Sequence, residues 1–110
     1  MKRNTIWIVD DDEHALMNAS ILGLKFRNFT VNCVESATMV KEASQDDIII
    51  LDYHGTDSRS LQNPNEAVVI LVSGDSDVNP DLTKPYRPKD LYDLINEKIS
   101  DKQNLEKNAA

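Results

Sequence analysis

The sequence predicts a single α/β domain built around a doubly wound parallel β-sheet. Three short apolar runs, at residues 5–9, 48–51 and 67–72, are nearly continuous and rich in β-branched side chains, which is typical of strands covered on both faces. Segments with helical spacing alternate with such runs, and this alternation favours a parallel sheet. With 110 residues, the chain has room for one domain and not for a second.

The remaining elements follow from local patterns. Apolar side chains recur at helical spacing between residues 12 and 27, whereas residues 29–34 alternate and therefore suit an edge strand. A second helix is expected over residues 36–44, with Ser36 as its N-cap. A last strand is expected at Leu82, and a last helix from Pro88 to Ile99, because proline suits the first turn of a helix.

Two connections depart from this regular alternation. Residues 53–66 are polar and interrupted by Pro64, so they are expected to be mostly loop. Only residues 74–81 connect the fourth predicted strand, which ends at Ser73, to the last strand at Leu82. A parallel crossover with its helix needs about a dozen residues. The helix after the third strand is therefore predicted to be reduced, and the helix after the fourth to be largely missing. We assign residues 1–100 to the domain and residues 101–110 to a polar, weakly helical tail, which is either a frayed helix end or a linker stub.

The charge balance limits what this domain contacts directly. Its 12 basic residues are scattered among 19 acidic ones, and a formal net charge of −7 argues against direct binding to nucleic acid or a membrane surface. The single cysteine, Cys33, excludes a disulfide framework. The first apolar run is too short for a signal peptide, and no run approaches the ~20 residues of a membrane span. A cytoplasmic protein is expected.

Charged and hydroxyl side chains stand where the predicted strands end: Asp10, Asp11, Asp52, Ser73 and Lys84. Because parallel strands end along one edge of a sheet, these side chains are expected to converge. Clustered carboxylates repel one another, and a divalent cation relieves that repulsion. Each residue taken alone also suits a purely structural role, as an acid at the start of a helix or as a turn residue at the end of a strand. The ordered set predicts a phosphoryl-transfer pocket.

The same residues divide into three chemical roles. A carboxylate attacks a phosphoryl group only when the repulsion between the two anions is lowered. Lys84 would supply an ammonium group for this purpose, and Ser73 a hydroxyl. The ion expected is Mg²⁺, which prefers few carboxylates and retained water. Its predicted protein ligands are Asp10, Asp11, Asp52 and the backbone carbonyl of His54.

From Ile6 to Ile99 the chain resembles the receiver domains of two-component response regulators, which are CheY-like. The acidic pair, Asp52, Ser73 and Lys84-Pro85 stand at strand ends in the order found in that family. The resemblance implies a five-stranded sheet of the flavodoxin/CheY-like type, Asp52 as phosphoacceptor, and a cis peptide bond before Pro85. It also implies Mg²⁺-dependent transfer from a sensor histidine kinase or phosphotransfer protein, then self-catalysed hydrolysis. Such a protein is a switch and not a metabolic enzyme.

The output of such a switch is left open by the sequence. A downstream protein partner, a missing output domain or a homodimer would each read the signal. Because the connection over residues 74–81 is short, docking is expected at the first helix, the last helix or the loop after Asp52.

Departures from the family pattern leave two other hypotheses about function open. Family members commonly carry Met-Pro where this chain has residues 53–56, and often an aromatic residue where it has Asp81. These losses favour the alternative of a degenerate receiver that acts as a phosphorylation-independent interaction module. A metal-dependent phosphohydrolase is disfavoured, because His54 stands where that chemistry expects a second acid and no substrate cap is evident.

Overall fold

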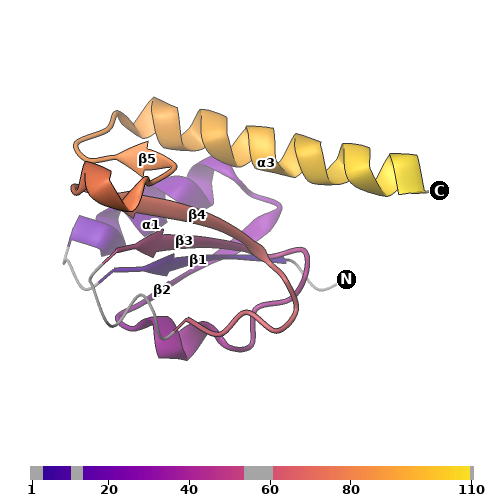
Figure 1. The fold of residues 1–110 in the computed structure, drawn as a ribbon, viewed down its shortest axis with the longest axis horizontal. Coiled ribbons are helices and arrows are strands. Elements are labelled where there is room, and N and C mark those ends of the chain that lie inside the picture. Colours follow the sequence, from indigo (N-terminus) through magenta and orange to yellow (C-terminus); the bar gives the residue numbers. More distant parts are fainter. Residues whose placement is uncertain (1–3, 11–13, 54–60, 110) are drawn as a thin grey trace.

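The computed structural model describes residues 4–10, 14–53 and 61–109, and its strands form one five-stranded parallel sheet (Figure 1). The strand order is β2-β1-β3-β4-β5. This result confirms the predicted fold class. The strands are β1 (Asn4–Val9), β2 (Phe29–Val34), β3 (Ile48–Asp52), β4 (Val68–Ser73) and β5 (Leu82–Thr83).

The position of each strand matches the hydrophobic pattern of its residues. All five residues of β3 are buried, because this strand lies at the centre of the sheet between β1 and β4. In β2 half-buried and exposed positions alternate up to Cys33, and this strand lies at the edge, as its sequence predicts.

Two helices cover one face of the sheet: α1 (His14–Lys25) and α3 (Pro88–Ala109). Leu22 of α1 and Leu91 and Ile95 of α3 pack in one cluster with alternate residues of the central strands. These strand residues are Ile6, Ile8, Ile48, Ile50, Ile70 and Val72. Because side chains along a strand point to opposite faces in turn, the residues between them face the other side.

The opposite face is covered by a shorter element than expected. The predicted helix over residues 36–44 is wrong beyond one turn: the structure has a 3₁₀ helix, η1 (Ala37–Val40), seen below the sheet in Figure 1. Ser36 is its N-cap, as predicted, and its hydroxyl oxygen accepts a hydrogen bond from Thr38 N. The buried residues of this stretch, Ala37, Val40 and Ala43, are three apart, which matches three residues per turn and not 3.6.

The two irregular connections have their own supports. Between β4 and β5 there is only a short 3₁₀ turn, η2 (Ser76–Val78), so the predicted loss of a helix there is confirmed. Before β4, the side-chain amide of Asn63 bonds both the N–H and the C=O of Ala67. No helix occurs in the described residues 61–67, and the rest of the predicted loop, residues 54–60, lies outside the description.

The last helix is ten residues longer than predicted, because α3 continues through residues 100–109. Six of those ten residues are Lys, Gln, Leu, Glu or Ala, which favour helix, although the stretch has no strong apolar pattern. At 22 residues, α3 is about 33 Å long, whereas a six-residue strand spans about 20 Å. Its C-terminal turns therefore project past the sheet, as Figure 1 shows.

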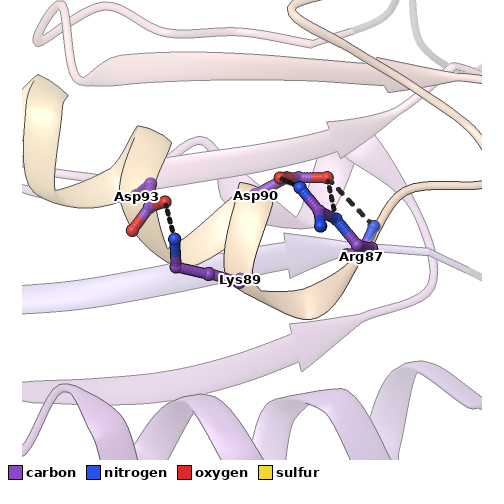
Figure 2. Close-up of polar contacts among 4 residues, drawn as sticks. All are labelled: Arg87, Lys89, Asp90 and Asp93. Atoms are coloured by element: carbon purple, nitrogen blue, oxygen red, sulfur yellow. Dashed lines mark hydrogen bonds and ion pairs between the residues drawn. The ribbon is translucent and has the colours of Figure 1, made fainter.

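The N-terminus of α3 is fixed by a polar cap (Figure 2). Arg87 N donates to the Asp90 carboxylate at 3.2 Å, and the Arg87 guanidinium pairs with the same group. The side-chain hydrogen bond from Arg87 is the main reason that the pKa of Asp90 is lowered. This acid also complements the positive end of the helix dipole. No helix within the described ranges is long and apolar enough to cross a membrane.

Candidate functional site

Three of the predicted charged residues converge at the carboxyl edge of the sheet. Asp10 directly follows β1, Asp52 is the last residue of β3, and Lys84 directly follows β5. Lys84 Nζ lies 2.6 Å from Asp52 Oδ2, to which it donates a hydrogen bond, and 3.9 Å from Asp10 Oδ2. Residues 84 and 52 are 32 positions apart, so the parallel topology alone brings them together.

The side chains of Asp52, Asp10 and Lys84 differ in how far they are exposed to solvent. The exposed fraction is 8% for the Asp52 side chain, 16% for Asp10 and 37% for Lys84. Burial by itself would lower the pKa of Lys84, but its hydrogen bond to Asp52 and the charges of Asp52 and Asp10 outweigh burial and raise that pKa. Lys84 is therefore an ammonium group at neutral pH. It contacts the carboxylates of Asp10 and Asp52, which lie where the buried core meets the surface.

Backbone bonds hold Lys84 at this place. Lys84 N donates to Ser73 O at 2.8 Å, which continues the β4–β5 ladder past the end of β5. The Lys84-Pro85 peptide bond is cis, as the family resemblance implies. Asp52 is fixed in a similar way, because the next residue, Tyr53, donates its N–H to Val72 O.

Ser73 reaches the same edge, at the end of β4, and is 2% exposed. Its hydroxyl oxygen accepts a hydrogen bond from Asp75 N at 3.0 Å. The hydroxyl proton is not used by that bond, because the oxygen is the acceptor. The structure thus places Ser73 next to Lys84, through the backbone bond between them. The Ser73 side chain accepts its hydrogen bond from Asp75, in the turn that follows β4.

The predicted metal ligands are only partly described. Asp10 and Asp52 are carboxylates facing one ammonium group, and hard oxygen donors of this kind suit Mg²⁺. The other two predicted ligands, Asp11 and the His54 carbonyl, lie outside the described residues. Within the described ranges, no three His, Cys, Asp or Glu residues gather in a metal-binding group. The described donors fit the ion as part of a larger set.

A small cavity lies behind the charged group. Its volume is about 30 Å³, which is room for about one water molecule, and its polar lining comes from Asp10, Asp52, Lys84 and Tyr86. Burial raises the pKa of the Tyr86 phenol, although the nearby Lys84 charge opposes the rise. Tyr86 is not among the predicted site residues; its place two residues after Lys84 is the signal that it also lines the site.

A second buried carboxylate, Asp47, lies at the opposite edge of the sheet and is missing from the predicted sites. It accepts hydrogen bonds from Thr5 N, Ser44 N and the Trp7 indole. Burial alone would raise the pKa of Asp47, but these hydrogen bonds outweigh burial and lower it. The donors Thr5 and Trp7 are 40 or more positions away, so no local pattern reveals this role. Asp47 anchors the starts of β1 and β3.

Asp81 has a structural role at the position where the family often has an aromatic residue. Its carboxylate accepts a hydrogen bond from Leu71 N at 2.8 Å, and its own N–H donates to Leu71 O at 2.8 Å. Asp81 thereby satisfies the N–H and C=O of Leu71 in β4, which a strand residue would otherwise pair, just before β5 begins.

Comparison with solved structures identifies this fold as that of receiver domains. A response regulator receiver domain protein (CheY-like) from Methanospirillum hungatei JF-1 matches with a TM-score of 0.60 and 18% identity, over 94% of this chain and 98% of that one. A CheY-like receiver domain from Methylobacillus flagellatus matches with a TM-score of 0.57 and 18% identity, over 87% and 98%. No protein-family model and no curated protein matches the chain. At this identity the likeness establishes the fold.

Proposed function

We propose that the chain is a response-regulator receiver domain in which Asp52 accepts a phosphoryl group. One observation carries this proposal: the 2.6 Å bond from Lys84 Nζ to Asp52 Oδ2, formed at the carboxyl edge of the sheet with Asp10 facing the same ammonium group. This bond would orient the carboxylate and keep a cation where the charge of an entering phosphoryl group builds up. The receiver-domain fold supports the same proposal.

The proposed donor is the phosphohistidine of a sensor histidine kinase or phosphotransfer protein. A carboxylate oxygen of Asp52 would attack the phosphorus atom, the P–N bond would break, and its electron pair would stay on the imidazole nitrogen. The product is an acyl phosphate on Asp52. Lys84 would then pair with a phosphoryl oxygen, and the Ser73 hydroxyl would donate to another. Attack by water at phosphorus would release inorganic phosphate and restore the carboxylate.

The proposed cofactor is Mg²⁺, held by Asp10 and Asp52 together with Asp11, the His54 carbonyl and water. Bound there, the ion would lower the repulsion between the carboxylate and the phosphoryl oxygens. The described oxygen donors, on Asp10 and Asp52, support this choice of ion.

A small phosphodonor tests the proposal without knowledge of the kinase. The protein is incubated with acetyl phosphate and Mg²⁺, and its intact mass is followed. We expect one added phosphoryl group in the wild type and none in Asp52→Asn. Asp77→Asn, a matched change at an exposed acid in the turn before β5, is the control and should be modified like the wild type. An unmodified wild type, under conditions that modify an ordinary receiver, would contradict the proposal.

A phosphorylation-independent interaction module is the second candidate function, and Asp81 is the observation that favours it. The two hydrogen bonds between Asp81 and Leu71 tie down a position that the family often gives to an aromatic residue. A domain of this kind would bind its partner equally well with or without Mg²⁺, and the substitution Asp52→Asn would leave binding unchanged. A large dependence of partner binding on either would remove this candidate.

The remaining parts of the proposal concern partners and location. Signalling would proceed through protein contacts, with a downstream partner, an output domain or a second copy. We also propose a cytoplasmic location, where the free thiol of Cys33 remains reduced.

A further inference from the structure

A large groove lies on the helix-covered side of the molecule, away from Asp52. Its volume is about 1000 Å³, and it runs along α3 from Lys89 to Gln103. The opposite wall is the end of α1 and the turn into β2, and the floor includes the first residues of β3 and β4, Ile48 and Val68. These floor residues are at the starts of strands, whereas Asp10 and Asp52 are at strand ends.

The groove follows one face of α3. Its lining residues on that helix include positions 89, 92, 96, 99 and 103, which are three or four apart, and positions 93, 98 and 102 lie beside them. The span from Lys89 to Gln103 is about 21 Å along the helix axis. A groove of this length suits a peptide segment better than a compact small molecule.

The charge of the groove is opposite to that of the whole chain. It is lined by five of the 12 basic residues, namely Lys25, Arg27, Lys89, Lys98 and Lys102, but by only two of the 19 acids, Asp46 and Asp93. A molecule with a formal charge of −7 therefore gathers a net positive charge in one groove. An anionic ligand would be attracted to this place and repelled from most of the remaining surface.

Internal ion pairs leave part of this positive charge uncompensated. Lys89 pairs with Asp93 at 3.5 Å, and Lys102 with Asp46 at 3.3 Å. The Lys102 ammonium is buried, so it is closed to a ligand, and its charge is balanced within the protein by Asp46. Among the ion pairs of the described residues, none involves Arg27 or Lys98.

Apolar contacts accompany these cations. The rings of Phe26 and Tyr92 meet edge to face at 6.3 Å and join the two walls of the groove, and Lys25 Nζ lies 5.4 Å from the Tyr92 ring centre. Leu24, which is 70% exposed, also lines the groove. On α1 it continues a stripe with the exposed residues Met17 and Ile21, at helical spacing. This stripe extends the apolar part of the surface beyond the groove.

We propose that this groove binds an acidic amphipathic helical segment of a partner protein. The acids of the segment would face Arg27 and Lys98, and its apolar side chains would cover Leu24 and the exposed stripe of α1. Binding of an amphipathic helix along a groove is a common mode of peptide recognition. The proposal goes beyond phosphorylation of Asp52 and does not depend on it.

A designed peptide tests the groove. The probe has about 14 residues, with Leu at positions i, i+3, i+4 and i+7 and Glu elsewhere, so that as a helix it matches the length of the groove. It is added to ¹⁵N-labelled protein without Mg²⁺ or a phosphodonor, and amide shifts are followed by NMR. We expect saturable shifts at residues 24–29 and 89–103. A peptide with Lys in place of Glu is the control and should not bind.

Charge reversal on the protein makes the test specific. Lys98→Glu should weaken binding of the acidic peptide by about tenfold, whereas Lys41→Glu, an equal change at an exposed residue after η1, should leave it within about twofold. Amide spectra of both variants report whether the fold is intact. Arg27→Glu provides a second reversal if Lys98→Glu does not fold.

Five results would overturn the proposal, and the first four concern ligands. They are the absence of peptide-induced shifts in the groove, equal binding of the Lys peptide, an unchanged affinity in the folded charge reversals, and shifts in the groove with ATP but not with the peptide. Concentration-dependent shifts of the groove amides without peptide would also overturn it, because a second copy of the chain would then be the occupant. Each of these results is independent of whether Asp52 is phosphorylated.

Discussion

At the residue scale, the two buried carboxylates of the sheet are stabilised in different ways. Asp52 contacts the ammonium group of Lys84, whereas Asp47 accepts three hydrogen bonds from N–H donors of β1, the loop before β3 and the Trp7 indole. The Lys84 ammonium is carried on a flexible side chain, so it can turn toward a new anion. The backbone N–H groups that bind Asp47 cannot turn in this way. This difference fits a reactive role for Asp52 and a structural one for Asp47.

Replacement of Asp47 tests its structural role. Asp47→Asn should lower the free energy of unfolding by about 3 kcal/mol at neutral pH, because the buried donors lose a charged acceptor. The folded-state pKa of Asp47 is lowered, so its stabilisation is complete above the unfolded pKa near 4 and is lost as pH falls through the folded value. The difference between variant and wild type should therefore narrow as pH falls below the unfolded pKa.

Urea unfolding at neutral and acidic pH measures this effect. Asp46→Asn is the matched control, because Asp46 is an exposed neighbour with one ion pair, and it should cost less than about 1 kcal/mol. A loss that is equal at both pH values would show that the Asp47 charge does not carry the stabilisation.

Lys84 is the residue whose charge the proposed chemistry uses. Lys84→Met keeps the length of the side chain but removes the ammonium group that contacts Asp52. We expect phosphorylation by acetyl phosphate to slow by about a hundredfold, because a fixed cation at the developing charge is lost. A time course of intact mass measures the rate. Lys41→Met, at an exposed site, should react like the wild type, and an unchanged rate in Lys84→Met would refute the assigned role.

At the scale of elements, β5 is the weakest part of the sheet. It has two residues, and its pairing with β4 is supported by the two hydrogen bonds between Asp81 and Leu71. Because Ser73 and Lys84 lie at the ends of β4 and β5, Asp81 also helps to hold both beside Asp52. The short connection thus still supports the site, although it lacks a helix.

Asp81→Ala removes one of these bonds. The Leu71 amide should exchange with solvent faster, and the domain should lose about 1 kcal/mol of stability, because an N–H at the end of the ladder loses its acceptor. Hydrogen exchange of the Leu71 amide measures the local effect. Asp81→Asn keeps an acceptor oxygen and should retain most of the protection. If protection of Leu71 is the same in Asp81→Ala, the side chain does not fix β4 to β5.

Local patterns explain how far the elements could be predicted. The strands β1 to β4 were predictable because each carries its own apolar or alternating pattern, whereas the two-residue β5 is too short to show one. The stretch over residues 36–44 was predicted as an α-helix because Ser36 looks like an N-cap, but a cap also starts a 3₁₀ turn. The extension of α3 through residues 100–109 was expected at most as a frayed helix end, because its polar residues show helical propensity without an apolar face.

The site was predictable where topology decides the geometry. Asp10, Asp52 and Lys84 were expected to meet because parallel strands end along one edge, and the structure places them together. Tyr86 and Asp47 were not identified, because the first shows its role only through the cavity that it lines and the second through donors about 40 residues away. Such contacts depend on packing and leave no local pattern.

At the scale of the whole molecule, the two edges of the sheet carry different charges and different proposed roles. The carboxyl edge holds the Asp10, Asp52 and Lys84 group, and the opposite edge meets the basic groove beside α3. The two helices that form most of that groove also cover the sheet behind the site, through Leu22, Leu91 and Ile95. A partner bound in the groove would therefore contact the same helices that support Asp52.

The central claim is that Asp52 is the residue that accepts phosphate, and chemical mapping tests it most directly. Protein treated with acetyl phosphate and Mg²⁺ is reduced with borohydride, which converts an aspartyl phosphate to homoserine, and is then digested and sequenced by mass spectrometry. The proposal predicts homoserine at position 52. Homoserine at another aspartate, or an unmodified position 52 in protein that carries the phosphoryl group, would contradict it.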